Sequence, residues 1–194
     1  MKRRTWDFIL TSVGALLTVG LIVAGSLLTW GASFANTSVH NQLAQQQISF
    51  PPATAFAHPA VNTEITPSMI PSVSQYAGQQ LQSGAQAEVY ADDFIAVHLQ
   101  EIGGGLTYSQ LSAKAMADPT NTVLQGQVAT IFKGTTLRGL LLEAYSFSIF
   151  GTIATIAAIS SWVLALLMLL LTALGVVHYR RTSNDVEFPQ SHNS

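Results

Sequence analysis

Three histidines in the central part of the sequence, His40, His58 and His98, are the residues best suited to hold a metal ion. His98 and Glu101 are three residues apart, a spacing that lets two side chains on one helix bind the same metal. Two histidines and a carboxylate hold the iron of non-haem oxygenases. The second histidine would have to be His40 or His58, and no second His-x-x-Glu pair exists for a di-iron site. A His98 that hydrogen-bonds at the edge of a packed helix is the simpler interpretation, so we predict no metal and no cofactor.

Other catalytic chemistry has little support. The chain has no cysteine, which excludes disulfides, thiolate metal sites and cysteine nucleophiles. No Gly-x-Ser-x-Gly motif marks a serine nucleophile. Asp92 and Asp93 point about 100° apart on a helix, and Glu88 with Asp92 supplies too few of the roughly six to eight oxygens that calcium takes. We predict a solvated acidic face here and a protein that is not an enzyme.

The composition indicates a membrane protein. Only 9% of the 194 residues are charged, against about a quarter in soluble domains. Two long stretches, 8–30 and 144–177, contain no charged residue at all. A net charge of −2 with eight scattered Lys and Arg excludes a nucleic-acid binder.

The first apolar stretch, residues 8–30, is predicted to be a transmembrane helix. A helix of this length covers about 34 Å, enough for a hydrocarbon core of about 30 Å. Lys2, Arg3 and Arg4 precede it, and Trp6 and Trp30 flank it at the two interfaces. A cleaved signal peptide with a site near Ser33–Ala35 is the alternative, but signal h-regions are only about 7–15 residues long.

The second apolar stretch is too long for one crossing, because 34 residues of helix cover about 51 Å. Arg180 and Arg181 follow one end of it, and counting back about 25 residues puts the other boundary near Phe150. The second span is therefore predicted at 150–177, with an aromatic belt of Tyr145, Phe147 and Phe150.

The basic residues predict the topology. Five of the eight Lys and Arg lie in the two short flanks, whereas residues 31–143 hold three against seven acids. Short basic flanks stay in the cytoplasm. We therefore expect the N-terminus (1–7) and a disordered tail (178–194) in the cytoplasm, and residues 31–149 outside the cell membrane. The inverted topology is the alternative. Arg138 is expected to reach lipid headgroups or to pair with an acid of the outer segment.

The outer segment is predicted to be a small helical bundle, which makes the chain an all-α membrane protein. A helical pattern continues past Trp30 through Val39, Leu43 and Ile48, and the Pro-rich stretch 51–71 is expected to be an extended connector. A helix is predicted over 72–102, with Tyr76, Ala87, Tyr90, Phe94 and Val97 on one stripe. The glycine run 103–105 ends it, and a capping box at 107–110 starts a helix to about residue 117. The last helix starts near 120–122, with a bend at Gly134, and leads into the second span.

Two sets of residues are candidate interaction surfaces. Small residues at four-residue spacing allow helices to approach closely, either within the chain or against another membrane protein or a second copy. These ridges comprise Gly20 and Ala24, Ala154 and Ala158, and Ala157, Ser161 and Ala165. The second set is a face of the outer segment made of Tyr76, Tyr90, Phe94, Val97 and His98.

Five motifs resemble a family of uncharacterised two-span membrane proteins from actinobacteria. The resemblance extends from about residue 36 to 158 and implies the same two-span architecture. Some members of that family carry labels as aromatic ring-opening dioxygenases. The motifs are QQQISFPP at 45–52, YADDFIAVHL at 90–99, GLTYS at 105–109, FKG at 132–134 and LRGLLL at 137–142.

The sequence therefore favours a non-enzymatic cell-envelope protein, a structural or accessory subunit that docks to a partner at the outer face. Its expected contacts are membrane lipids and another membrane protein or a second copy, with no nucleic acid. A ligand-binding sensor or transport accessory is the alternative, and a metal-dependent ring-opening dioxygenase comes last.

Overall fold

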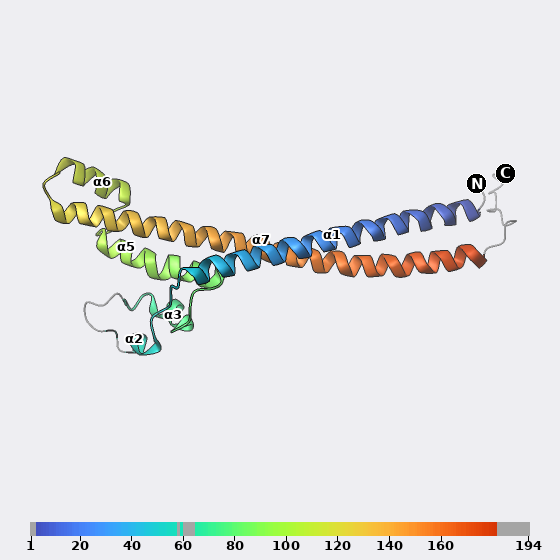
Figure 1. Cartoon of the computed structure of the whole chain (residues 1–194), viewed down its shortest axis with the longest axis horizontal. Helices are drawn as coiled ribbons and strands as arrows, with labels where there is room; N and C mark the ends of the chain where they lie inside the picture. The colour runs from blue at the N-terminus through green and yellow to red at the C-terminus, as the bar shows by residue number, and fades with distance from the viewer. Residues whose placement is uncertain (1–2, 58, 60–64, 182–194) are drawn as a thin grey trace, which may run out of the picture. The chain divides into compact units, whose positions relative to one another are not determined.

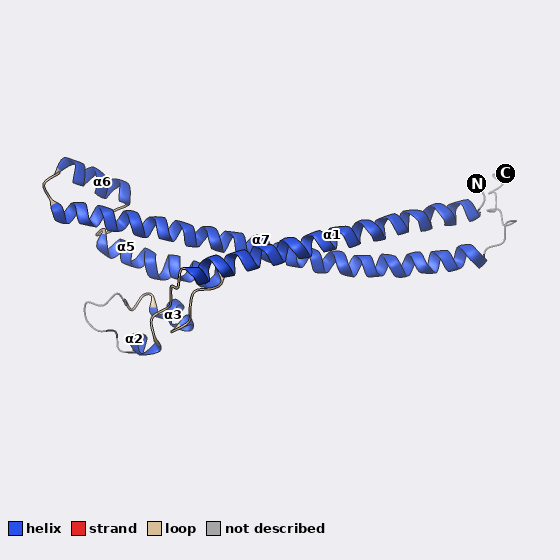
Figure 2. Ribbon diagram, viewed as in Figure 1, coloured by secondary structure: helices blue, strands red, loops and turns tan. Residues whose placement is uncertain are grey.

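The computed structural model describes residues 3–57, 59 and 65–181 (Figure 2). About 83% of these residues are helical and none lies in a β-strand, so the predicted all-α class is confirmed. The helices in chain order are α1 (Arg3–Gln45), α2 (Ala53–Ala57), α3 (Ile70–Val73), the 3-10 helix η1 (Ser74–Tyr76), α4 (Gly84–Val89), the π-helix η2 (Tyr90–Ile95), α5 (Ala96–Ile102), α6 (Tyr108–Ala117) and α7 (Thr122–Arg181).

Two of these helices, α1 and α7, are long and apolar enough to cross a membrane. Their most apolar windows are only 17% and 11% buried, whereas the core helix of a soluble protein is mostly buried. The helical pattern predicted beyond Trp30 is confirmed through Val39 and Leu43, since α1 continues to Gln45, but Ile48 lies beyond the end of the helix. Helix α7 likewise contains the predicted last helix and the whole of the second apolar stretch.

The described residues form two compact units. Residues 3–33 and 152–181 make up one, called here the two-helix unit, and residues 34–57, 59 and 65–151 make up the other, the central unit. In the two-helix unit the start of α1 lies beside the end of α7 (Figure 1). The contacts, in order along α1, join Phe8 with Tyr179, Thr11 with Gly175, Gly14 with Thr172, and Gly25 and Thr29 with Trp162. Residue numbers rise on one helix as they fall on the other, so the two segments are antiparallel.

Small residues line this helix–helix contact. Thr18 and Ala32 on α1 and Ala158 and Ala165 on α7 are all buried. On each helix these positions are separated by multiples of seven residues, the repeat of a coiled-coil seam. Because their side chains are short, the two backbones approach closely, as is typical of helix pairs in membranes.

The core of the central unit collects apolar side chains from α1, α2, α3, α4, η2 and α7 and from the loops between them. Helix α6 packs separately, burying Leu111 and Ala115, and Gln125 of α7 donates to the Ala115 carbonyl at 3.0 Å. The buried core residues are Val39, Leu43, Phe50, Phe56, Met69, Val73, Leu81, Ala87, Ala91, Phe94, Ile95 and Leu141.

Two predicted elements of the central unit are wrong in part. The connector 51–71 is not extended throughout, because α2 and the start of α3 lie within it; residues 58 and 60–64 lie outside the described residues. The helix predicted over 72–102 is continuous only from Gly84, because Gly78 has a φ of +69° and turns the chain. The segment after this turn lies antiparallel to the segment after α1, where Phe50 N–H donates to the Gln79 carbonyl and Leu81 N–H to the Ile48 carbonyl, both at 2.9 Å.

Other predicted boundaries are confirmed. The capping box is present, with Gln110 N–H donating to Thr107 Oγ1 at 3.3 Å and Thr107 N–H to Gln110 Oε1 at 3.0 Å. Helix α5 ends at Ile102, where Gly104 and Gly105 adopt positive φ. Helix α7 begins at Thr122, as predicted. It is one uninterrupted α-helix at Gly134, where the sequence predicted a bend, and the absent side chain there makes room for Leu99 of α5.

Two glycines of α7 give a matched test of this contact. A Cβ at Gly134 would overlap the Leu99 side chain, whereas a Cβ at Gly139 would meet nothing within 4 Å. We expect Gly139→Ala to stabilise the central unit by about 0.5–1 kcal/mol through helix propensity. Gly134→Ala should instead destabilise the central unit, because Leu99 must move and this cost exceeds the gain from helix propensity. Hydrogen exchange of the full chain in detergent would report the difference, and equal effects of the two substitutions would contradict the α5–α7 contact.

Candidate functional site

A row of five aromatic rings runs through the central unit and contains most of the predicted outer face. Tyr90, Phe94 and His98 follow one another at four-residue intervals across η2 and α5. Phe50, from the loop after α1, bridges Tyr90 to Tyr76 of η1. The ring centroids are 5.3 Å apart for Tyr76–Phe50, 5.2 Å for Phe50–Tyr90, 4.8 Å for Tyr90–Phe94 and 4.6 Å for Phe94–His98.

This row is an internal packing element. Phe50 is 2% exposed and Phe94 is 8% exposed, and Tyr76, Tyr90 and Val97 pack against the same core. The apolar stripe predicted from the sequence did not include Phe50. This residue lies in the loop between α1 and α2, just before Pro51 and Pro52. Its position in the QQQISFPP motif was the available signal.

His98 is held by its own helix. Its Nδ1 lies 2.7 Å from the Phe94 carbonyl oxygen, and its Nε2 is buried without a hydrogen-bond partner. No three His, Cys, Asp or Glu side chains of the described residues are grouped so as to hold a metal ion. His40 is exposed on α1, and His58 lies outside the described residues. The geometry therefore gives His98 the hydrogen bond predicted for a structural histidine.

One acidic side chain of α4, Glu88, and one of η2, Asp92, contact α7. Arg138 Nη2 lies 2.5 Å from Asp92 Oδ1, so Arg138 takes the second of its two predicted roles and pairs with an acid. One turn before Asp92, Glu88 is hydrogen-bonded to the Tyr145 hydroxyl. This bond and the negative charge of Glu88, with a smaller contribution from desolvation, raise the pKa of Tyr145 above its ordinary value of 10.0. Glu88 and Asp92 thus hold α7 individually and do not converge on a common ligand.

The Arg138–Asp92 pair is expected to contribute little to stability. Both side chains are more than a third exposed, at 38% and 44%, and exposed pairs contribute about 0.2–1 kcal/mol. Arg138→Gln should therefore lower the free energy of unfolding of the central unit by about 0.5 kcal/mol, with the loss shrinking at high salt. Chemical denaturation of the full chain at two salt concentrations measures this. A salt-independent loss of several kcal/mol would show that Arg138 has a different role.

The small-residue ridges are divided between two environments. On α7, Ala158, Ser161 and Ala165 are buried, and Ala154 and Ala157 are half-buried. On α1, Ala24 is half-buried and Gly20 is exposed, with nothing within 4 Å of an added Cβ. The contact with α7 is made instead by Gly14, Thr18, Gly25 and Ala32, which the sequence reasoning missed. The seven-residue spacing of Thr11, Thr18, Gly25 and Ala32 was the signal for this face, and Gly14 lies four residues before Thr18.

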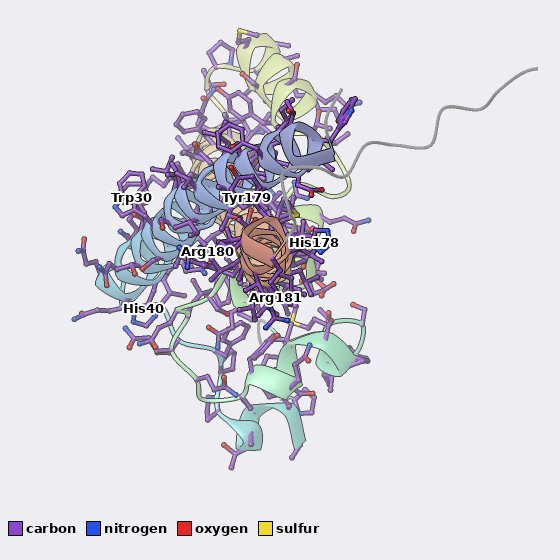
Figure 3. All side chains as sticks on the ribbon, turned by 90° about the vertical axis from the view of Figure 1, so that its right-hand side faces the viewer. Trp30, His40, His178, Tyr179, Arg180 and Arg181 are labelled. Atoms are coloured by element: carbon purple, nitrogen blue, oxygen red, sulfur yellow. The ribbon has the colours of Figure 1, made fainter. Side chains whose placement is uncertain are left out.

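Polar and aromatic residues lie at the N-terminal end of α1 and at the C-terminal end of α7. Figure 3 labels His178, Tyr179, Arg180 and Arg181 at the C-terminal end of α7, where positive charge is favourable to the helix dipole. His178 Nε2 lies 3.8 Å from Asp7 Oδ2, and the Phe8 and Tyr179 rings are 6.1 Å apart. Trp30, also labelled, is exposed on α1.

Grooves open on several sides of the central unit. One, of about 530 Å³, is lined by Leu106, Tyr108 and Ile131 among others. Another, of about 310 Å³, lies between α5 and α7 and is lined by Phe94, His98, Lys133 and Leu137 among others. A third, of about 420 Å³, lies between the end of α1 and the middle of α7 and has Leu43 and Leu141 in its floor. The lining of each of these grooves is mostly apolar.

Comparison with known proteins finds no matching family model, no similar curated protein and no similar solved structure. The functional assignment therefore rests on the residues and their geometry.

Proposed function

We propose that this chain is a non-enzymatic, two-span protein of the cell membrane that docks to a partner at the outer face. Its N-terminus and C-terminus are cytoplasmic, and the central unit is on the outer side. Support comes from the low burial of the most apolar windows of α1 and α7 and from the basic residues at Arg180 and Arg181. The partner is another membrane protein or a second copy, and membrane lipids surround the spans.

The pairing of the two helices supports narrower bounds for the second span than its length alone. Phe8 lies beside Tyr179, and Gly25 beside Trp162, so each step along α1 is matched by a step back along α7. Trp30 then falls opposite about residue 156. A first span at 8–30 pairs with a second span at about 156–178. This second span starts about six residues later than the 150–177 predicted from length alone and ends about one residue later.

The observation that carries the proposal is a group of exposed apolar side chains beyond these spans. Phe34 on α1 and Phe147 and Phe150 on α7 are all at least 40% exposed, and Phe147 and Phe150, three residues apart, share one face of α7. From Phe8 to Phe34 a helix rises about 39 Å, which exceeds a hydrocarbon core of about 30 Å. Exposed apolar surface outside the bilayer marks a protein interaction site, which supports docking next to the membrane.

A topology reporter and a crosslinking experiment test this function. A periplasmic reporter enzyme inserted after Pro119, in the loop between α6 and α7, should be active, and the same reporter at the C-terminus should be inactive. A photo-crosslinking residue in place of Phe150 should give one defined adduct in native membranes, and one in place of His40 should give none. A cytosolic central unit, or no adduct from Phe150, would overturn the proposal.

A ligand-binding role is the second candidate, and the groove of about 310 Å³ between α5 and α7 favours it. Its apolar walls and Lys133 suit an amphipathic anion such as a medium-chain fatty acid. Such a ligand should raise the unfolding temperature of the full chain in detergent, and Lys133→Gln should remove the effect. An unchanged unfolding temperature would count against this role. A ring-opening dioxygenase has the least support, because the described residues bring no ligand set around His98.

A further inference from the structure

A groove of about 420 Å³ lies between α1 and α7 in the central unit. Leu43 and Leu141 form its floor, and both are buried members of the core cluster. Leu140 and Phe147 stand at its walls and are 59% and 40% exposed. Helices α4 and α5 cover other faces of α7, through Gly84 at Ser148 and Leu99 at Gly134. Helices α4 and α5 therefore leave the groove between α1 and α7 uncovered.

The rim of the groove carries three polar side chains. They are Gln42 and Gln46 from the end of α1 and Glu143 from α7. None of the three side chains has a hydrogen bond or ion pair within the described residues. Glu143 is the one charged residue of the lining, and the two amides donate hydrogen bonds that a carboxylate accepts. A surface with the same three groups, rotated by a half turn, is therefore complementary to this one.

We infer that the occupant of this groove is a second copy of the same chain, packed about a twofold axis. The inference rests on the proposed function and identifies the partner. Two copies in one membrane have the same orientation, which a twofold axis along the membrane normal preserves. In a twofold dimer the same surface of each copy contacts the other. Leu140 and Phe147 are exposed beside the groove, so those of each copy would fill the groove of the other. Glu143 of each copy then accepts from Gln42 or Gln46 of the other.

The same face continues along α1. Gln42, Gly31 and Gly20 follow one another at eleven-residue intervals along α1. Residues eleven apart on an α-helix point within about 20° of each other, so the three share one face. A Cβ added at Gly31 or Gly20 would meet nothing within 4 Å. Bare backbone at Gly31 and Gly20 allows a second α1 to approach closely on this face of the helix.

Single cysteines test the dimer directly, because the natural chain contains none. Two differently tagged copies carrying Gly31→Cys are co-expressed and oxidised in native membranes. Gly31→Cys should give a disulfide-linked dimer containing both tags. Ser33→Cys is the matched control, since Ser33 is exposed about 160° away around α1 and should not crosslink. No dimer from Gly31→Cys, or equal crosslinking from the two positions, would overturn the inference.

A second pair of variants tests the groove itself. Leu140→Arg places a charge in the proposed interface and should reduce the Gly31→Cys dimer about tenfold or more. Val123→Arg is the control, because Val123 is exposed on the same helix but does not line the groove. An undiminished dimer with Leu140→Arg would contradict the groove as the contact.

The two proposals fail in different ways. A photo-crosslinking residue at Leu140 that captures a protein other than a second tagged copy would overturn the dimer and leave the docking function standing. No adduct from either Leu140 or Phe150 would overturn both.

Discussion

Replacing Gly84 with valine is expected to destabilise the central unit by about 3 kcal/mol, which is the upper end of the cost of overpacking a core. Gly84 is the first residue of α4 and is buried against α7. A Cβ at this position would overlap the Oγ and Cβ atoms of Ser148 and would lie 3.4 Å from the Cα of Tyr145. Because the backbone of α7 stands behind Ser148, the helix cannot yield without moving as a whole. Hydrogen exchange of the full chain in detergent measures the loss of protection in α4 and η2.

A compensating substitution separates this contact from a general intolerance of side chains at the helix start. Gly84→Ala alone should destabilise, because even a methyl group overlaps Ser148. Gly84→Ala combined with Ser148→Gly removes the overlapped side chain and should recover most of the loss, apart from about 1 kcal/mol for a new glycine within α7. Wild-type protection in Gly84→Val, or no recovery in the double variant, would show that α4 does not approach α7 at Ser148.

Local signals in the sequence were sufficient for helix ends that depend on nearby residues. The Thr107–Gln110 capping box and the glycine run after Ile102 specify their turns through backbone groups only a few residues away. A second capping box, Ser83 with Gln86, starts α4 in the same way. It was overlooked because the apolar stripe from Tyr76 to Val97 was interpreted as one helix.

Long-range pairing was not predictable from these signals. Arg138 had several acids to choose from, and only the packing of η2 on α7 selects Asp92, 46 residues away. Phe50 has no helical neighbours that repeat its pattern, so its place between Tyr76 and Tyr90 depends on the turn at Gly78 and on the antiparallel pairing of 48–51 with 78–81. Ridges of small residues were found by four-residue spacing, which does not distinguish the face of α1 that packs on α7 from the face that contains Gly20.

The Gly25→Leu substitution is expected to separate α1 from α7 in the two-helix unit, whereas Gly20→Leu is expected to leave this contact intact. A Cβ at Gly25 would lie 3.1–3.3 Å from the indole of Trp162, and the larger side chain of leucine would displace it. The hydrogen bond of 3.2 Å from Trp162 Nε1 to Thr29 Oγ1 would be lost with it. Overpacking of this kind costs about 1–3 kcal/mol, and a hydrogen bond between membrane helices contributes about 0.6 kcal/mol.

A cysteine pair reports the separation. An added Cβ at Gly175 would lie 3.7 Å from the Cβ of Thr11, within the range of about 3.5–4.5 Å found in disulfides. A chain with Thr11→Cys and Gly175→Cys should therefore oxidise to an intrachain disulfide, with no natural cysteine to compete. Adding Gly25→Leu should lower the oxidised fraction, and adding Gly20→Leu should leave it unchanged, because Gly20 has no neighbour on its open side. If both leucines lowered the fraction equally, the seven-residue seam through Thr18, Gly25 and Ala32 would not be the surface on which α7 packs.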